Sequence, residues 1–274
     1  MKPTKTVKAN IRVHEKLLEI GEYQKSPHRK IESKIRLQKI LKDIDAKIFN
    51  SNKNIKHADI GCGDGFVFEC SPSTWNSHGV DAAPLMLEAC KKNHQHVLTY
   101  QSTADSLPFD DESIDIVTCY SFLDHLENRS SFYKEAKRVL KKDGVCYFGL
   151  SPNRIFADAL KATSDDFNYE KFSQNKLQHE FKKIFSNGDH YADEFDLDPE
   201  DLIIAEPGKS ESGGMNPSDE IRELSTAGFK KIKITYNWIM AQNELDEETI
   251  RTIEQMLPIS ASCFKYFDIF AIKE

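Results

Sequence analysis

A glycine-rich turn beside an acidic residue is the part of the sequence best suited to hold a ligand. Residues 57–65 read HADIGCGDG, in which Asp59 precedes three closely spaced glycines. Glycine lets the backbone turn sharply and approach a ligand, and a helix that follows offers free N–H groups. The spacing is G-x-G-x-G, whereas a dinucleotide site has G-x-G-x-x-G. The early carboxylate attracts a cation rather than a pyrophosphate, so the turn favours a ligand that carries an ammonium group and a sulfonium.

A second acid follows at a spacing that suits a nucleoside. Asp81 stands in HGVDAAPLML, 22 residues after Asp59, where a carboxylate can accept hydrogen bonds from both hydroxyls of a ribose. The alternative to a ligand site is that the glycines only form a tight strand-to-helix turn and that Asp81 only caps a strand. The spacing after a glycine turn favours ribose binding.

The candidates for acid–base chemistry are Asp124 and His125, in SFLDHLEN just beyond a predicted strand. At this edge of a doubly wound sheet they could hold or deprotonate a nucleophile. His125 could equally cap or pack the next helix, and Asp124 suits an N-cap better than a base.

These residues need a parallel sheet to bring them together. Short apolar segments alternate with helical ones and predict βαβ units. The predicted strands are 57–60, 79–81, 96–101, 114–120 and 145–150, then 229–238 and 267–273, with helices at 64–70, 84–93, 130–141, 217–227 and 247–256. We predict a seven-stranded α/β sheet in the order 3-2-1-4-5-7-6, with the last strand antiparallel.

The remaining segments predict helices outside this core. Ile11, His14, Leu17 and Leu18 mark one helix, and Ile31, Ile35, Ile40, Ile44 and Ile48 mark a second, with a break at Ser26 or Pro27. The βα alternation stops between Asn153 and Gly214, where helices are predicted at 169–185 and 199–205. The predicted organisation is a helical cap at 1–50, a core at 51–152, an insert at 153–214 and the rest of the core at 215–274.

The combination of motifs resembles a known family. The stretches HADIGCGDGFVFE, VDAAPLMLEACKK, STADSLPFDDESIDIVTCYSFLDHL and FYKEAKRVLKKDGVCYF follow one another over about residues 55–152. They resemble the class I S-adenosylmethionine (SAM)-dependent methyltransferases with a Rossmann-like fold. Within these, the chain is most similar to the ubiquinone and small-molecule group, known as methyltransferase type 11.

The resemblance implies a set of cofactor-binding residues. Asp59 and the turn Gly61, Cys62, Gly63 and Gly65 would line the methionine part of SAM, and Asp81 would bind the ribose. Ala82 and Met86 would flank the adenine, with Thr103 and Ala104 at its edge and Tyr120 under the methionine moiety. Thr103 replaces the usual Asp, so either Thr103 or Asp105 would contact the base.

The acceptor would bind above the same sheet edge. The insert at 153–214 follows the fifth strand and is expected to act as a lid, with His190 and Tyr191 as weak contact candidates and Gly213–Gly214 as a hinge. The N-terminal helices resemble the segment that closes over SAM, which would bring Tyr23 and His28 near the site. We expect one small-molecule acceptor, methylated at O, N or C.

Composition limits the other possibilities. Hydrophobic residues make up 39% and charged residues 30%, as in soluble proteins, and no apolar run approaches the roughly 18 residues of a membrane span. Residues 1–56 hold 15 Lys/Arg against 6 Asp/Glu, whereas 155–220 hold 6 against 16, with a net charge of −7 overall.

Without a basic–aromatic stripe we expect no nucleic-acid partner. The six cysteines lack metal-ligand spacing, so we expect no metal and a cytoplasmic protein with reduced thiols. The sequence does not indicate an oligomeric state.

Two other functions compete with a methyltransferase. A nucleotide-dependent dehydrogenase is disfavoured by the glycine spacing and by the early acid. A non-catalytic SAM-binding or interaction protein on the same scaffold remains an alternative, because a fold does not determine a function.

Overall fold

The computed structural model describes residues 3–51, 54–166, 192, 195–239, 242 and 245–274. Helices α1 (Lys5–Glu19) and α2 (Ile31–Ile48) come first, separated by the short 3₁₀ turns η1 (Tyr23–Lys25) and η2 (Pro27–Arg29). The βα alternation then begins, in agreement with the sequence pattern. Its elements are β1 (Lys56–Ile60), α3 (Phe66–Cys70), β2 (Asn76–Asp81), α4 (Pro84–Asn93), β3 (Leu98–Gln101), β4 (Ile114–Tyr120), η3 (Leu123–His125), α5 (Arg129–Val139) and β5 (Leu140–Pro152).

The later elements complete the sheet and add helices beyond its edge. They are α6 (Arg154–Asp166), α9 (Pro199–Ala205), α10 (Pro207–Ser210), α11 (Pro217–Ala227), β6 (Phe229–Ile239), α12 (Glu247–Gln255), η5 (Ile259–Cys263) and β7 (Phe264–Lys273). None of the described helices is both long and apolar enough to cross a membrane.

Seven strands form one sheet in the order β3-β2-β1-β4-β5-β7-β6, which confirms the predicted topology. β1 pairs in parallel with both β2 and β4, and β7 runs antiparallel between β5 and β6. Parallel strands end at a common edge, so the residues that follow β1, β2 and β4 meet there.

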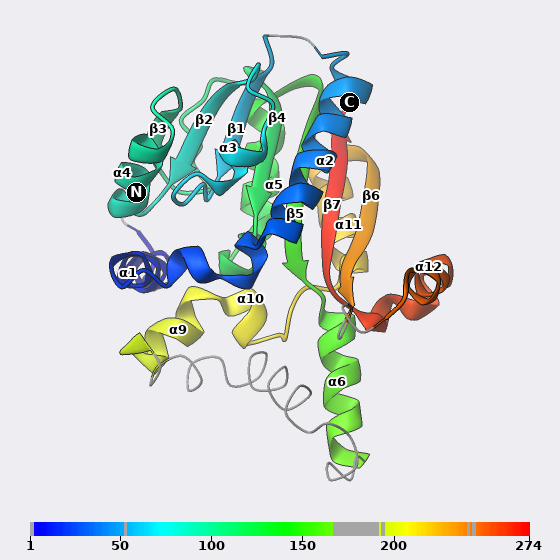
Figure 1. Ribbon diagram of the computed structural model, residues 1–274. Helices are drawn as coiled ribbons and strands as arrows, with labels where there is room; N and C mark the ends of the chain where they lie inside the picture. The colour runs from blue at the N-terminus through cyan, green and yellow to red at the C-terminus, as the bar shows by residue number, and fades with distance from the viewer. Residues whose placement is uncertain (1–2, 52–53, 167–191, 193–194, 240–241, 243–244) are drawn as a thin grey trace.

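Helices cover both faces of this sheet (Figure 1). On one face, Leu37 and Leu41 of α2 pack with Val67 of α3 against the sheet. On the other, Phe132 and Tyr133 of α5 and Leu224 of α11 bury the opposite side chains. Because both faces are covered, the central strand β4 is buried along most of its length.

The sequence pattern placed the buried face of α2 correctly only at Ile40, which packs against the core, and at Ile44, which is buried. Ile31, Ile35 and Ile48 of the predicted apolar stripe are exposed, and the buried face carries Leu37, Leu41 and Ile44. Side chains on one face of a helix recur every three or four residues. The five-residue step from Ile35 to Ile40 therefore places Ile31 and Ile35 on a different face from the one that Leu37 and Leu41 share.

Several predicted boundaries also differ from the structure. β5 begins at Leu140, where the fifth helix was expected to continue to residue 141, and β7 begins at Phe264 rather than at Phe267. The predicted helix 169–185, His190 and Tyr191 lie outside the described residues.

Three helices lie beyond the carboxyl-terminal edge of the parallel strands. α1 and α9 pack on each other there through Ala9, Val13, Leu202 and Ala205, and α10 packs on η3 (Figure 1). The first helix and a segment almost 200 residues later therefore form one layer over the sheet edge.

Candidate active site

The glycine turn after β1 is tight enough to exclude any other residue at two positions. Gly61 and Gly63 have positive φ angles of 68° and 54°, which favour glycine. A β-carbon on Gly61 would lie 2.2 Å from the ring of Phe122, and one on Gly63 would lie 2.3 Å from the hydroxyl of Tyr23. Glycine at these two positions therefore lets Phe122 and Tyr23 lie directly against the backbone of the turn.

Asp81 connects this turn to the end of β2. Its carboxylate accepts hydrogen bonds from the N–H groups of Gly63 and Ala83, each at 2.9 Å. Burial raises the pKa of this carboxyl, although the backbone donors act in the opposite direction. A carboxylate held at the end of the second strand is available to accept hydroxyl donors from the cavity.

Asp59 is held by a chain of polar side chains inside the sheet. The hydroxyl of Thr118 donates to Asp59 at 2.6 Å, and His57 Nε2 lies 2.7 Å from the same hydroxyl. Ser77 completes the chain at 3.1 Å from His57 Nδ1. Asp59 is 1% exposed, and burial raises its pKa to about 8. The acid that precedes the glycines is thus kept in place and easily protonated.

The other predicted cofactor residues fall into two groups. Those that line the cavity beside the turn are Cys62, Ala82, Met86, Thr103, Ala104 and Tyr120. Gly65 and Asp105 are not in its lining: Gly65 packs against His94 at the start of α3, and Asp105 is exposed. The hydroxyl of Thr103 donates to Asp105 at 2.6 Å, so Asp105 orients the hydroxyl of Thr103 without itself lining the cavity.

Asp124 and His125 meet elements that the sequence did not connect with them. His125 Nδ1 lies 3.0 Å from the carbonyl oxygen of Ala205 in α9 and 2.7 Å from the side-chain amide of Asn10 in α1. The ring of His14 packs edge-on against that of His125 at 5.0 Å. Asp124 is 5% exposed. Gly208 in α10 lies so near that a β-carbon on it would be 3.0 Å from the Cα of Asp124.

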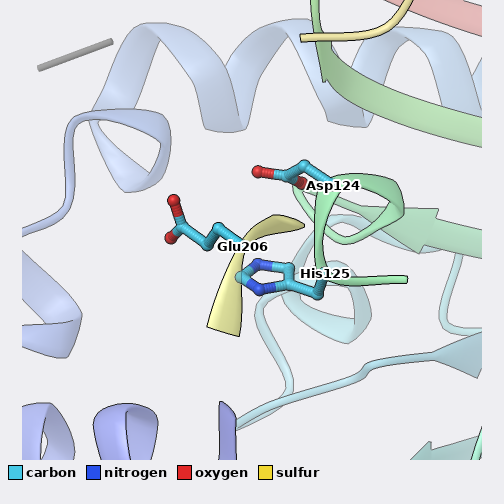
Figure 2. A group of neighbouring side chains, drawn as sticks. All are labelled: Asp124, His125 and Glu206. Carbon is cyan, nitrogen blue, oxygen red and sulfur yellow. The ribbon is translucent and has the colours of Figure 1, made fainter. Parts of the chain in front are cut away.

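Glu206 and Lys209 were missed by the sequence analysis. Glu206 precedes α10, and its carboxylate pairs with Lys209 at 2.9 Å. Burial would raise the pKa of Glu206, but Lys209 and His125 lower it to about 2, while Glu206 keeps the pKa of Lys209 raised. Ligand atoms of Asp124, His125 and Glu206 lie within 4.8 Å of one another, and Figure 2 shows the three side chains around one space.

The segment between α1 and α2 closes the other side of the glycine turn. Arg29 pairs with Asp64 at 2.8 Å, and both side chains are almost fully buried. The Arg29 guanidinium also lies over the rings of Tyr23 and Phe66, at 5.1 and 4.9 Å from their centroids. Tyr23 and His28, which the sequence placed near the site, both line the cavity. Arg29 was missed, because only the folded chain shows that its partner is an acid of the glycine turn.

One cavity of about 420 Å³ is lined by residues of the glycine turn with Asp59 and Asp81, and also by Asp124, His125 and Glu206. Its walls include Phe122, Phe156, Trp238 and Tyr266. The cavity therefore connects the glycine turn and its two acids with a group of side chains that can exchange protons.

Comparison with known sequences supports a methyltransferase domain. Residues 58–148 match the family described as methyltransferase domain. An uncharacterized methyltransferase of Bacillus subtilis, YcgJ, is 40% identical over 92 residues, which cover 31% of this chain and 36% of that protein. Ubiquinone biosynthesis O-methyltransferase of Pelagibacter ubique is 30% identical over 122 residues, covering 41% of this chain and 51% of that protein. The chain thus spans about a third to a half of the length of these relatives.

Solved structures agree on the fold. The crystal structure of YcgJ superposes with a TM-score of 0.53 at 17% identity, over 87% of this chain and 97% of that one. A phosphoethanolamine N-methyltransferase of Haemonchus contortus gives 0.57 at 15% identity, over 99% of this chain and 61% of that one. At these identities the likeness shows the Rossmann-like methyltransferase fold. With the sequence match, residues 58–148 are similar to a methyltransferase domain, within a chain that has the Rossmann-like methyltransferase fold.

Proposed function

We propose that this protein transfers a methyl group from SAM to a nucleophilic atom of one small organic acceptor. The observation that carries the proposal is the single cavity, because it joins the glycine turn and Asp81 to Asp124 and His125. A cofactor bound at one end would then face an acceptor held at the other.

The residues at the turn fit SAM. Gly61 and Gly63 line the cavity without a side chain, and Asp81 offers a fixed carboxylate for the ribose hydroxyls. Asp59 lies in the cavity wall beside the turn, where its carboxylate suits the ammonium group of the methionine part. Met86 and Ala104 provide apolar walls for the adenine, and Thr103 provides a hydroxyl at its edge.

Bound SAM would supply a methyl group on a sulfonium, a donor that is already activated. The protein's own contribution is then to position the acceptor and to exclude water. Tyr23 and His28 close the cavity from the segment after α1, and Leu202 and Lys209 close it from α9 and α10. His125 Nε2 is the candidate to hold or accept a proton from the nucleophile.

The size and charge of the cavity support a small acceptor. A volume of about 420 Å³ lies within the range of small-ligand pockets and must also contain the cofactor. The insert at 153–214 is proposed as the lid, since Phe195, Leu202 and Gly213 of its described part line the cavity. Its excess of acidic residues disfavours nucleic acid as the acceptor.

A cytoplasmic location is proposed on the cysteines alone. Five of the six are buried and unpaired, and Cys263 is exposed and unpaired. Free thiols of this kind suit a reducing compartment.

Titration calorimetry with SAM, S-adenosylhomocysteine and NAD tests the cofactor part. The wild type should bind the first two and not NAD. Asp81→Ala should weaken SAM binding at least tenfold, because each lost hydrogen bond to a carboxylate contributes about 1.5–3 kcal/mol. Asp111→Ala, an exposed acid on the loop before β4, should leave SAM binding unchanged.

Transfer itself is tested by incubating the protein with methyl-labelled SAM and fractions of a small-metabolite extract. Labelled product in a small-molecule fraction supports the proposal. SAM binding without transfer to any fraction would instead favour the non-catalytic alternative.

A further inference from the structure

The carboxylate of Asp124 is the starting point, because one of its oxygens is buried without a partner. Asp124 is 5% exposed and lies in the cavity wall, and Oδ1 has no hydrogen-bond partner within the described part of the chain. An unmatched buried carboxylate is costly, so it indicates a place where a ligand supplies the missing donor.

The cations around the cavity each have a partner already. The pairs are Lys25 with Glu22, Arg29 with Asp64 and Lys209 with Glu206, and Lys265 lies over the ring of Tyr266. Asp59 and Asp81 belong to the cofactor end of the cavity. Burial raises the pKa of Asp124, although His125 and Lys209 act in the opposite direction, and with that carboxyl ionised the group Asp124, Glu206 and Lys209 carries a net charge of −1. A positively charged donor is therefore the complementary ligand.

His125 is fixed on one side of its ring. Nδ1 lies 3.0 Å from the carbonyl oxygen of Ala205 and 2.7 Å from the amide nitrogen of Asn10, which also donates to that oxygen at 3.4 Å. Because Nδ1 is engaged by α9 and α1, Nε2 is the ring nitrogen left to accept a proton from a ligand, in the tautomer that carries its proton on Nδ1. Figure 2 shows the imidazole facing the carboxylates of Asp124 and Glu206.

We propose that the acceptor is a small amine whose ammonium group donates to Asp124 Oδ1 and whose proton passes to His125 Nε2. The inference rests on the proposed methyl transfer and specifies its substrate class. Once deprotonated, the amine's lone pair forms the N–CH₃ bond as the C–S bond breaks and sulfur takes the bonding pair. The products are a methylated ammonium, S-adenosylhomocysteine and the proton held on His125.

The surrounding residues favour an amine over a divalent metal ion at this position. Asp124, His125 and Glu206 are close enough to share a cation, but Lys209 already pairs with Glu206, and the net charge of −1 that remains matches a monovalent ammonium better than a divalent metal ion. Phe122, Phe156 and Trp238 in the cavity wall offer apolar surface for the carbon part of an amine.

The experiment compares molecules that differ only in the charged group. Protein saturated with S-adenosylhomocysteine is titrated with benzylamine, phenethylamine and propylamine, and with the alcohol and carboxylate of each carbon skeleton. We expect each amine that binds to do so at least tenfold more tightly than its alcohol. Asp124→Asn should remove this preference, and Asp43→Asn on the exposed side of α2 should retain it.

Each outcome distinguishes this inference from the proposed function. If S-adenosylhomocysteine fails to bind the wild type, the methyltransferase proposal fails. If it binds but alcohols equal the amines, if no amine binds at 10 mM, or if Asp124→Asn keeps the amine preference, the amine inference is wrong. Stoichiometric Mn²⁺ binding that Asp124→Asn abolishes would assign the group to a metal and would also overturn the inference.

Discussion

Asp59 shows how burial can couple cofactor binding to a proton. Its pKa is raised to about 8, so at pH 7 the carboxyl is mostly protonated in the ligand-free protein. An ammonium group beside it stabilises the ionised form and lowers that pKa. SAM binding at pH 7 should therefore release close to one proton. At pH 9 the carboxyl is already ionised and the α-amino group of free SAM is mostly neutral, so binding as the ammonium should take up protons instead.

Calorimetry in buffers of different ionisation enthalpy measures this release. Asp59→Asn should remove it, whereas Asp105→Asn, an exposed acid, should not. Asp81 also has a raised pKa, so persistence of the release in Asp59→Asn would assign the proton to another carboxyl.

His125 offers a test of catalysis that leaves the cofactor end intact. Its Nδ1 is held by α9 and α1, and the residue lines the cavity, so Nε2 is the nitrogen proposed to meet an acceptor. His125→Ala should lower the methyl-transfer rate by roughly 10²–10⁴, because general acid–base catalysis contributes about that factor. SAM affinity should remain near the wild-type value.

The control for this prediction is His96→Ala, since His96 is exposed in the loop after α4. A His125→Ala protein with a lower melting temperature but an unchanged rate per folded molecule would show that the imidazole only packs α9 against η3.

Among the elements, the pairing of α1 with α9 decides whether the cavity is closed. Three ion pairs join α1 to this region, Lys5–Glu200, Arg12–Asp201 and Lys16–Asp196, but each involves exposed groups and contributes little. The buried contacts of Ala9 and Val13 with Leu202 and Ala205 are the main stabilising part.

Leu202→Ala should therefore loosen this layer without unfolding the sheet. Loss of a buried leucine side chain costs about 2–5 kcal/mol, here confined to α1 and α9. We expect faster amide hydrogen exchange in residues 5–19 and 199–210 and weaker binding of S-adenosylhomocysteine.

Ile203→Ala on the same helix is the matched comparison, because Ile203 is 46% exposed. Equal effects of the two substitutions, or increased exchange throughout the sheet, would contradict a layer held by its apolar contacts.

For the whole molecule, the insert can be removed without separating the ends of the core. Asn153 and Met215 form a parallel bridge, and the N–H of Met215 donates to the carbonyl of Pro152 at 2.8 Å. Replacing residues 154–214 by a short glycine–serine linker should leave a folded sheet. SAM binding should be weakened but measurable, and turnover of the acceptor should be lost.

Circular dichroism and calorimetry on this deletion measure the two parts separately. Retained turnover would show that the acceptor pocket is built from the sheet edge and the N-terminal helices alone. Loss of the fold would show that the insert is part of the core.

Much of the fold could be predicted from the chain because its signals are local. The alternation of apolar strands with helices, Pro84 at the start of α4 and Gly228 at the end of α11 are read within a few residues. Part of the face of α2 was mispredicted because isoleucines on an exposed helix side look apolar in the sequence. Only contact with the sheet distinguishes Leu37 and Leu41 from Ile31 and Ile35.

The sequence by itself determined the part of the site that we propose binds the cofactor. A turn with positive φ angles requires glycine, and an acid at the end of each of two neighbouring parallel strands must lie at the same sheet edge. Only the tertiary structure decided the acceptor end. Asp124 and His125 are surrounded by residues that lie 80 or more positions away in the chain, namely Asn10, Ala205, Glu206 and Lys209. Contacts over such distances produce no regular residue spacing in the sequence, so no motif could predict them.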